Sequence, residues 1–486
     1  MRCAAALAAS LLVLTVAPGA WASPSSKTTA AVSLGDSYIS GEAGRWNGNS
    51  LTPIGDKDGA DRACRPPGLA CQVDKTRVYE PGTENGGCHR SDVAEIKSAR
   101  LSVAERIDLS CSGGQTKNIF RASRGGVGQN GEPPQADKLR PVARAKNVKL
   151  VMLSIGGNDL GFADIVEACL TAYASRTGPC APSQQRKLDS LKSKVIADVG
   201  KAIDEIRAVM SEAGYAIDDY RLIVQTYPSV VPRAAESRYP ELSPERTTNG
   251  CPFYDQDLNW ARDSAAPQIG GVVKAGASSR RVEILDLVDA FQGHEFCSKT
   301  AAQSTPFFRP TAADAEWGRF VAASALQQGE LQELFHPNAY GQRALGTCVT
   351  RVFAAARRGT FACSGAAGIG PGELALRRLS SFSRRRARLQ LRVNGRTRRI
   401  RGRRCITGPV RTTVTGRDRA RARRAEFFVG RRRVARDPRR PLSRIVDRRR
   451  HLGPSHRHAV RVRVRMGDGR LARLRGVYRM CGDRRT

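Results

Sequence analysis

The sequence predicts an α/β fold built on a mainly parallel sheet, followed by a small antiparallel β domain. Short, continuously apolar runs recur through residues 28–288, and such runs are typical of parallel strands covered on both faces. An amphipathic segment lies between two of these runs, and strands that alternate with helices indicate a layered α/β sandwich. After a Gly-rich stretch, apolar and basic residues alternate, which is typical of antiparallel strands.

Residues 1–22 are typical of an export signal rather than of a folded element. Arg2 precedes the apolar run AAALAASLLVLTV, and AWA at positions 20–22 is a small-x-small cleavage site. The apolar run is too short to span a membrane. We therefore expect a secreted, extracellular protein, either free or associated with the cell surface.

The cysteine count agrees with export. Of 13 cysteines, Cys3 lies in the signal segment, and an even number of 12 remains in the exported chain, which predicts disulfides. No two cysteines have CxxC spacing, so a zinc site is not expected. The simplest pattern pairs neighbours in the sequence: Cys64 with Cys71, Cys88 with Cys111, Cys169 with Cys180, Cys251 with Cys297, Cys348 with Cys363, and Cys405 with Cys481.

Five apolar runs are predicted to form the sheet, and two segments are predicted to form helices. The strands are expected at residues 28–35, 105–111, 147–156, 220–227 and 280–288. A helix is expected after Pro182, because six aliphatic side chains recur there at helical spacing. These are Leu188, Leu191, Val195, Val199, Ile203 and Ile206. A last helix is expected within residues 337–359.

Charge divides the chain into two parts. Residues 381–486 contain 37 Arg, no Lys and 6 acidic residues, a net charge of +31, which leaves only +5 for residues 1–380. We predict a signal peptide at 1–22, an α/β domain at 23–365, a linker at 366–380 and an Arg-rich β domain at 381–486. Within the last, VNGR and GDGR are predicted hairpin turns.

Three of the predicted strands end in small polar or glycine-rich turns. The first delivers Ser37, the second Gly113 and the third Asn158. The carboxyl ends of parallel strands share one edge of a sheet, where ligands bind. Ester hydrolysis needs a hydroxyl nucleophile and hydrogen-bond donors for the developing oxyanion. Ser37 is the candidate nucleophile, and the donors would be the Ser37 and Gly113 N–H groups and the Asn158 amide.

A serine nucleophile also needs a base, and histidine is scarce in this chain. Of six histidines, His336 precedes a proline and a predicted helix start, so that its loop is stiff and its ring is fixed. Glu333, three residues earlier, is a candidate to orient the imidazole, as an acid does in Ser-His-Asp triads. Whether the site is a triad or a dyad stays open.

The blocks GDSYISGE, CSGG, GGND and HPNAYGQ, in this order, resemble those of the SGNH (GDSL) hydrolases, in particular secreted bacterial lipases and esterases. The resemblance covers residues 29–363 and includes CHRS at 88–91. It implies a flavodoxin-like three-layer α/β/α sandwich with a mainly parallel five-stranded sheet. It also implies ester hydrolysis without a metal or cofactor, with Ser37 as nucleophile, His336 as base, and Gly113 and Asn158 as oxyanion donors.

The predicted activity is that of an exported lipase or esterase acting on an ester or lipid substrate, and we expect a monomer. One alternative is a carbohydrate O-acetylesterase or a phospholipase of the same fold. Another is a catalytically inactive surface-binding protein. The Arg-rich domain has two interpretations: a solvated face, or an array that binds an anionic surface such as phospholipid or wall polymer. Nucleic acid ranks lower, because aromatic residues are not interleaved with the arginines.

Overall fold

The computed structural model describes residues 27–50, 61–65, 72–278, 280–321, 329–381, 389–400, 402–430, 432–437, 442–447, 457–466 and 471–481. The predicted signal segment and Cys71 lie outside these ranges. Seven strands form the central sheet in the order β4-β1-β5-β6-β7-β8-β9. Their bounds are Thr29–Gly35 (β1), Glu105–Asp108 (β4), Asn147–Ser154 (β5), Arg221–Gln225 (β6), Glu283–Asp286 (β7), Gly359–Ser364 (β8) and Ala375–Ser381 (β9).

All five predicted strands form, and the α/β class is confirmed. They lie in the order second, first, third, fourth and fifth, and each pairs in parallel with its neighbours. This strand order is the one found in flavodoxin-like sheets. The apolar side chains along these strands are buried, as expected for a sheet covered on both faces.

The predicted strand count of five is wrong, because β8 and β9 extend the sheet to seven strands. β8 continues the parallel part beside β7, and β9 pairs antiparallel with β8. β9 lies largely within residues 366–380, where a linker was expected. Its side chains are mostly exposed and two of them are arginines, so its composition is that of a solvated segment although its backbone pairs with the sheet.

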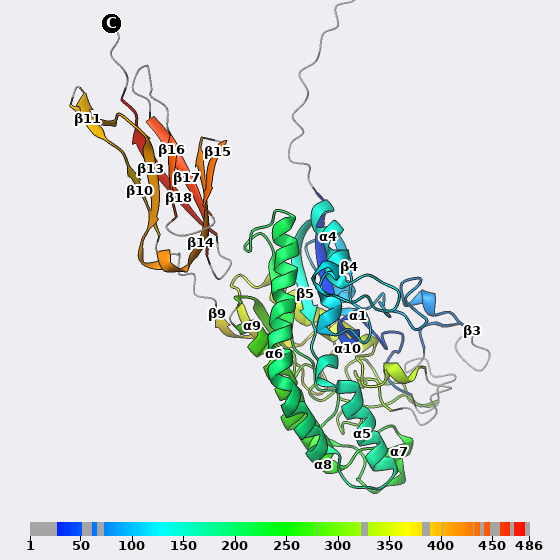
Figure 1. The fold of residues 1–486 in the computed structure, drawn as a ribbon. Helices are drawn as coiled ribbons and strands as arrows, with labels where there is room; N and C mark the ends of the chain where they lie inside the picture. The colour runs from blue at the N-terminus through cyan, green and yellow to red at the C-terminus, as the bar shows by residue number, and fades with distance from the viewer. Residues whose placement is uncertain are drawn as a thin grey trace, which may run out of the picture.

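Helices cover both faces of the sheet (Figure 1). The long helix α6 (Ala181–Glu212) contacts α4 (Gln135–Ala145) and α9 (Ala266–Ser278). The short helix α2 (Glu95–Ser98) contacts α10 (Ala339–Ala354). Both α6 and α10 lie where the sequence predicts a helix. Among the described helices, none combines the length and the apolar character needed to cross a membrane.

The other short elements lie in connections between the larger ones. They are α1 (Ser37–Ser40), α3 (Thr116–Ile119), α5 (Phe162–Ala174), α7 (Pro244–Thr248), α8 (Asp255–Trp260), a π-helix at Ala261–Ala265, 3-10 turns at Lys75–Arg77, Ala122–Arg124, Asn158–Leu160, Ala234–Glu236, Leu331–Glu333 and Arg417–Arg421, and a two-stranded hairpin of β2 (Cys64–Arg65) and β3 (Gln72–Val73). The π-helix joins α8 to α9 and reappears below as part of a pocket wall.

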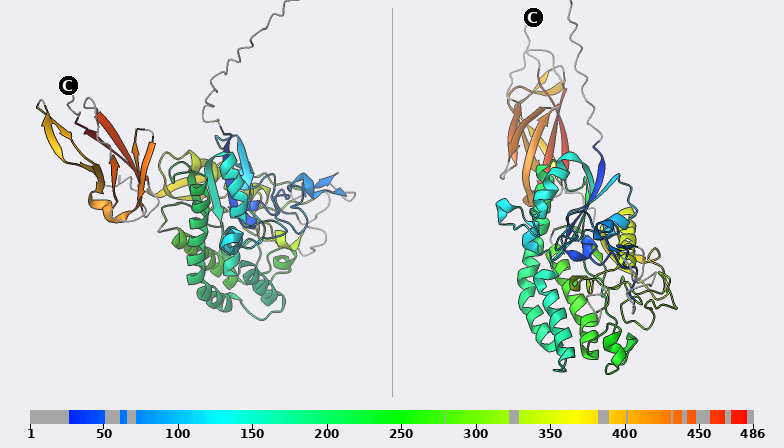
Figure 2. Two further views of the ribbon diagram at one scale, coloured as in Figure 1. Left: turned by 45° about the horizontal axis from the view of Figure 1, so that its top comes forward. Right: turned by 90° about the vertical axis from the view of Figure 1, so that its right-hand side faces the viewer.

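The C-terminal strands form antiparallel sheets, as predicted (Figures 1 and 2). One sheet has the order β10-β13-β16, a second β15-β14-β17-β18, and β11 pairs with β12. The bounds are Gln390–Asn394 (β10), Thr397–Ile400 (β11), Arg403–Ile406 (β12), Val410–Thr415 (β13), Ala422–Val429 (β14), Arg432–Asp437 (β15), Ser443–Asp447 (β16), Arg457–Met466 (β17) and Leu471–Arg479 (β18). Valines, leucines and Phe427 fill the core of this domain.

One of the two predicted hairpins is wrong. The strands on either side of VNGR do not pair with each other, because β10 pairs with β13 and β11 with β12. The apolar face of β10 packs in the core of this domain, and this long-range burial outweighs the local turn signal. The strands on either side of GDGR, β17 and β18, do pair antiparallel, although residues 467–470 lie outside the described ranges.

Four of the predicted cysteine pairs lie at bonding distance in the structure. They are Cys88–Cys111, Cys169–Cys180, Cys348–Cys363 and Cys405–Cys481. The pairing of Cys251 with Cys297 is wrong: both are buried free thiols, joined by a hydrogen bond between their side chains. Proximity in sequence does not by itself provide the sulfur geometry that a disulfide requires. Because Cys71 is not described, the first predicted pair stays a prediction.

Candidate active site

Ser37 lies at the point where β1 ends and α1 begins. Asp36 is the N-cap of α1, and its side chain accepts a hydrogen bond from the Tyr38 N–H at 3.2 Å. The preceding Gly35 is held on both sides by Gln135, which accepts from its N–H and donates to its carbonyl, each at 2.7 Å. These contacts fix the turn that presents the Ser37 hydroxyl at the carboxyl edge of the sheet.

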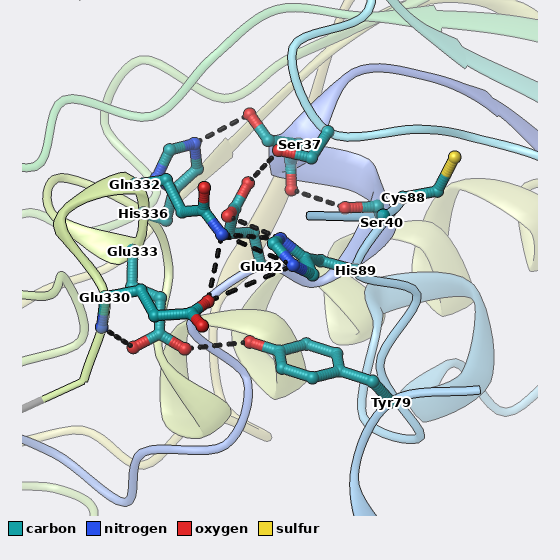
Figure 3. A network of polar contacts seen from close by, with 12 residues as sticks. Ser37, Ser40, Glu42, Tyr79, Cys88, His89, Glu330, Gln332, Glu333 and His336 are labelled. Atoms are coloured by element: carbon teal, nitrogen blue, oxygen red, sulfur yellow. Dashed lines mark hydrogen bonds and ion pairs between the residues drawn. The ribbon is translucent and has the colours of Figure 1, made fainter. Parts of the chain in front are cut away.

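His336 meets Ser37 at this edge, although the two residues are 299 positions apart in the chain. The imidazole Nε2 lies 2.6 Å from the serine Oγ (Figure 3). The other ring nitrogen, Nδ1, lies 3.0 Å from the carbonyl oxygen of Leu334. A carbonyl only accepts, so Nδ1 carries the proton and Nε2 of the neutral ring accepts from Ser37. Burial lowers the pKa of His336 below its usual value, which favours this neutral form.

The loop that carries His336 is held by its backbone. The His336 carbonyl accepts from the Arg319 N–H at 2.8 Å, and the Phe335 N–H donates to the Arg319 carbonyl at 3.0 Å. The Tyr38 hydroxyl donates to the Phe335 carbonyl at 2.7 Å. Phe335 has a φ of +66°, a left-handed conformation that is strained for a bulky residue. Such strain persists where the surrounding structure determines the conformation, as these contacts do here.

The expected role of Glu333 in orienting the imidazole is wrong, because its carboxylate is engaged elsewhere. Its oxygens accept from Trp46 Nε1 at 2.8 Å, from the Tyr79 hydroxyl at 3.0 Å and from the Glu330 N–H at 3.1 Å. These donors hold the carboxylate in a buried network beside the loop, while the Leu334 carbonyl takes the place expected for the acid.

Asn158 and the CSGG turn lie together, as the shared strand edge predicts. The Asn158 Nδ2 donates to the Gly114 carbonyl at 2.9 Å, and Gly113 adopts a left-handed φ of +73°. Gly114 packs against the turn that carries Ser37. A Cβ atom on Gly114 would lie 2.7 Å from the Gly35 oxygen, so there is no room for a side chain at this position. The roles of Gly113 and Asn158 as oxyanion donors stay predictions.

A short chain of hydrogen bonds joins the Ser37 turn to the Asn158 turn. The Tyr227 hydroxyl donates to the Asp36 carboxyl group and accepts from the Gly157 N–H at 3.0 Å. Burial raises the pKa of Asp36 to about 7. Asp36 and Tyr227 therefore connect the turn that carries Ser37 to the turn that carries Asn158.

A histidine-carboxylate pair, formed by His89 and Glu42, lies beside Ser37 and His336 (Figure 3). His89 Nδ1 is 2.8 Å from Glu42 Oε1, and the other Glu42 oxygen accepts from the hydroxyl of Ser112, the residue before Gly113. Burial opposes the charged imidazole, but the bonded Glu42 carboxylate together with the charges of Glu330 and Glu333 raises the pKa of His89 above its usual value. The Glu42 charge also acts to raise the pKa of His336, against the larger effect of burial.

An apolar pocket opens beside Ser37. The space in it that no protein atom fills measures about 950 Å³, and this figure includes open solvent. Asp36, Ser37 and Asn158 are among its lining residues, and residues 227–231, Phe253 and Phe335 also contribute to its wall. Apolar side chains of α5, α8, the π-helix and α9 line much of the remainder. These include Phe162, Ile165, Leu258, Ala261, Ala265 and Ile269. The pocket is suited to a hydrocarbon chain attached to a carbonyl held at Ser37.

The sequence did not predict three parts of this site: the Leu334 carbonyl, the Glu42–His89 pair and the pocket lining. A backbone carbonyl has no side-chain signature. His89 follows Cys88, which bonds to Cys111, so its position alone indicates no more than a place beside a disulfide. The lining residues follow the same apolar pattern as core residues, so only the packing of the helices shows that a space is left between them.

Comparisons with known proteins find distant likenesses only. No protein-family model matches the chain, and no curated protein sequence matches it. Among solved structures, phospholipase A1 from Streptomyces albidoflavus NA297 is 21% identical, with a TM-score of 0.39, covering 68% of this chain and all of its own (100%). A spore cortex lytic enzyme from Clostridium perfringens is 12% identical, with a TM-score of 0.17, covering 70% of this chain and 93% of its own. Neither likeness is close enough to carry an argument about this chain.

Proposed function

We propose that the protein is a serine ester hydrolase that cleaves carboxylic esters through an acyl-enzyme on Ser37. The observation that carries the proposal is the 2.6 Å contact between Ser37 Oγ and His336 Nε2, in a ring whose Nδ1 proton is held by a carbonyl. A hydroxyl and a neutral imidazole in this arrangement form an activated nucleophile. The resemblance of the four sequence blocks to SGNH hydrolases supports the same role.

The chemistry follows from the geometry. His336 Nε2 takes the hydroxyl proton as Ser37 Oγ attacks the ester carbonyl carbon, and the carbonyl oxygen becomes an oxyanion. The Ser37 and Gly113 N–H groups and the Asn158 amide would stabilise this charge. Collapse returns the proton from Nε2 to the departing alkoxide and leaves the acyl group on Ser37. Water, deprotonated by the same nitrogen, then attacks the acyl carbon. The bond to Ser37 Oγ breaks, the proton passes from Nε2 to Oγ, and the carboxylic acid leaves.

The apolar pocket supports an acyl chain longer than acetyl as the bound group. Its helical walls offer apolar contact well beyond Ser37, which an acetyl group would leave empty. We therefore favour a lipase, esterase or phospholipase over a carbohydrate O-acetylesterase. A panel of p-nitrophenyl esters of increasing acyl length tests this preference. A rate that is highest for acetate and falls with each added carbon would favour the acetylesterase.

Labelling with a fluorophosphonate tests the nucleophile directly. We expect the full-length protein to be labelled on Ser37 and the Ser37→Ala variant to show neither labelling nor turnover of p-nitrophenyl esters. Asn158→Ala is expected to keep the labelling site and to lose about 10²–10³ in rate, which is typical of one oxyanion donor. Full activity of Ser37→Ala would overturn the proposal, and an unlabelled, inactive wild type would favour a surface-binding protein.

The cysteine pairs of the described residues are compatible with an extracellular protein. We propose that the chain is exported, with cleavage after residue 22. N-terminal sequencing of the mature protein recovered from the medium tests both points. A mature chain that still begins at Met1 would contradict the signal assignment.

A further inference from the structure

The sheet β15-β14-β17-β18 (Figures 1 and 2) carries exposed arginines on the face turned away from the core of the C-terminal domain. Along β17, Val460, Val462 and Val464 are buried in the core of the C-terminal domain. Successive side chains of a strand point to opposite faces, so Arg461 and Arg463 lie on the outer face, and both are exposed.

The register of β17 and β18 places these arginines opposite two others. Arg461 pairs with Arg475, and Arg463 pairs with Arg473. Arg473 and Arg475 are also exposed. Directly opposite residues of an antiparallel pair have Cβ atoms about 5 Å apart, and like charges there are destabilising. We refer to Arg461, Arg463, Arg473 and Arg475 as the arginine grid.

The neighbouring strand β14 does not supply the grid with an acidic partner. Its Glu426 lies opposite Arg463 but is bonded to Arg424 at 2.6 Å, and it also lies 3.6 Å from Arg433. Phe428 lies under the Arg463 guanidinium, 5.1 Å from its ring centre. The grid is therefore a concentration of positive charge without a carboxylate of its own among the described salt bridges.

We propose that the arginine grid binds the phosphate headgroups of an anionic phospholipid surface. Guanidinium groups bind phosphate oxygens through two parallel hydrogen bonds, and phosphates between the paired arginines would relieve their mutual repulsion. The grid extends both along the strands and across them, and this two-dimensional spread matches a surface of headgroups. Val477, 46% exposed on the same face of β18, adds an apolar contact of the kind that membrane-surface binders use.

Nucleic acid matches this face less well. Proteins that bind single strands stack bases on exposed aromatic rings. The aromatic ring described on this face, Phe428, is already covered by the Arg463 guanidinium. The proposal concerns binding alone and does not depend on the activity of Ser37.

The test is cosedimentation of the full-length protein with vesicles. One set contains equal parts of phosphatidylglycerol and phosphatidylcholine, and the other is phosphatidylcholine alone. Each arginine near an anionic surface contributes about a fivefold factor to partitioning, so four contribute roughly several hundredfold. We expect binding to the anionic vesicles only, and we expect it to weaken strongly between about 0.05 and 0.5 M salt, because salt screens surface charges.

Two quadruple variants with the same loss of charge separate the grid from net charge. In the grid variant, Arg461, Arg463, Arg473 and Arg475 become Gln. In the matched control, four exposed arginines of the same domain become Gln: Arg398, Arg399, Arg417 and Arg419. We expect the grid variant to lose roughly a hundredfold or more in partitioning and the control to lose less than about tenfold. Circular dichroism spectra and unfolding midpoints that match the wild type show that both variants are folded.

Three results would overturn the proposal. Equal binding to both kinds of vesicle would remove the electrostatic basis, and equal losses in the two variants would assign binding to net charge. The third concerns competition by a single-stranded oligonucleotide. It would be met if the oligonucleotide releases the protein from anionic vesicles when its phosphate concentration is lower than that of the vesicle lipids. That result would identify nucleic acid as the ligand of this face.

Discussion

The Nδ1 atom of His336 lies 3.0 Å from the carbonyl oxygen of Leu334, only two residues earlier in the chain. This local contact sets the tautomer of the imidazole and turns Nε2 toward Ser37. The proposed site is therefore a serine-histidine dyad whose ring is oriented by the main chain. The contacts of Glu333 and Glu42, the lining of the apolar pocket and the burial of Glu95 lead to four predictions.

Replacing Glu333 should affect stability more than catalysis. Glu333→Gln places an amide opposite the Trp46 and Tyr79 donors, and loss of one acceptor in this buried network costs about 1–3 kcal/mol. We expect kcat to fall less than about tenfold, against about 10²–10⁴ for His336→Ala, which removes the general base. Steady-state kinetics and urea unfolding measure the two effects. A loss of kcat in Glu333→Gln as large as in His336→Ala would restore the carboxylate as the orienting group.

Replacing Glu42 should move the pH dependence of the reaction. The base works when neutral, so kcat/KM falls as the pH drops through the pKa of His336. Burial places that pKa below its usual value, and the charges of Glu42 and Glu333 act to raise it while His89 acts to lower it. We expect Glu42→Gln to move the acid limb of kcat/KM to lower pH and to lower the plateau, since the contact with Ser112 is also lost.

The matched control for this pH profile is Glu167→Gln, on the exposed side of α5. It removes the same charge at a position that the structure does not place in the site, and we expect both limb and plateau to match the wild type. If Glu42→Gln lowers the plateau but leaves the acid limb in place, then the role of Glu42 is one of packing only.

Narrowing the pocket should shorten the preferred acyl chain. Ala261 lies where α8 meets the π-helix and lines the pocket wall. We expect Ala261→Phe to reduce kcat/KM for p-nitrophenyl esters of long acids by about tenfold or more, because one or more methylenes lose their apolar contact. Esters of short acids should be hydrolysed as before. Ala275→Phe, at an exposed position of α9, is the control, and a uniform loss for all chain lengths in Ala261→Phe would contradict the pocket assignment.

A buried acid outside the proposed serine-histidine dyad should make stability depend on pH. Burial raises the pKa of Glu95 from 4.5 to about 8, although its carboxylate accepts from Gln225 at 2.9 Å. Between these values the folded state binds the extra proton, so the free energy of unfolding falls as the pH rises, and it stops falling above about 8. Glu95→Gln removes this dependence.

We therefore expect the stability of Glu95→Gln relative to wild type to increase from pH 5 to pH 9, by an amount on the order of a few kcal/mol. Urea unfolding of both proteins across this range measures the difference. A constant difference at all pH values would show that Glu95 has the same protonation state in the folded and unfolded chains.

The class of the fold and the meeting of Ser37, Asn158 and His336 could be predicted from the residues alone. Continuous apolar runs indicate parallel strands, and parallel strands bring the residues that follow them to one edge. The same logic does not extend to β9 or to the VNGR stretch. An exposed arginine-bearing strand has the composition of a linker, and the partner of β10 is chosen by burial of its apolar face in a core made by distant residues.

How the imidazole is held, what Glu42 and His89 contact, and where the apolar pocket lies became visible only in the folded chain. The acceptor on Nδ1 is the carbonyl of Leu334, and every residue type carries an identical carbonyl, so no side chain in the sequence identifies it. Glu42 and His89 meet 47 positions apart through the path of the chain around the site. The pocket exists because four helical segments leave a space between apolar side chains that, in the sequence, are indistinguishable from a filled core.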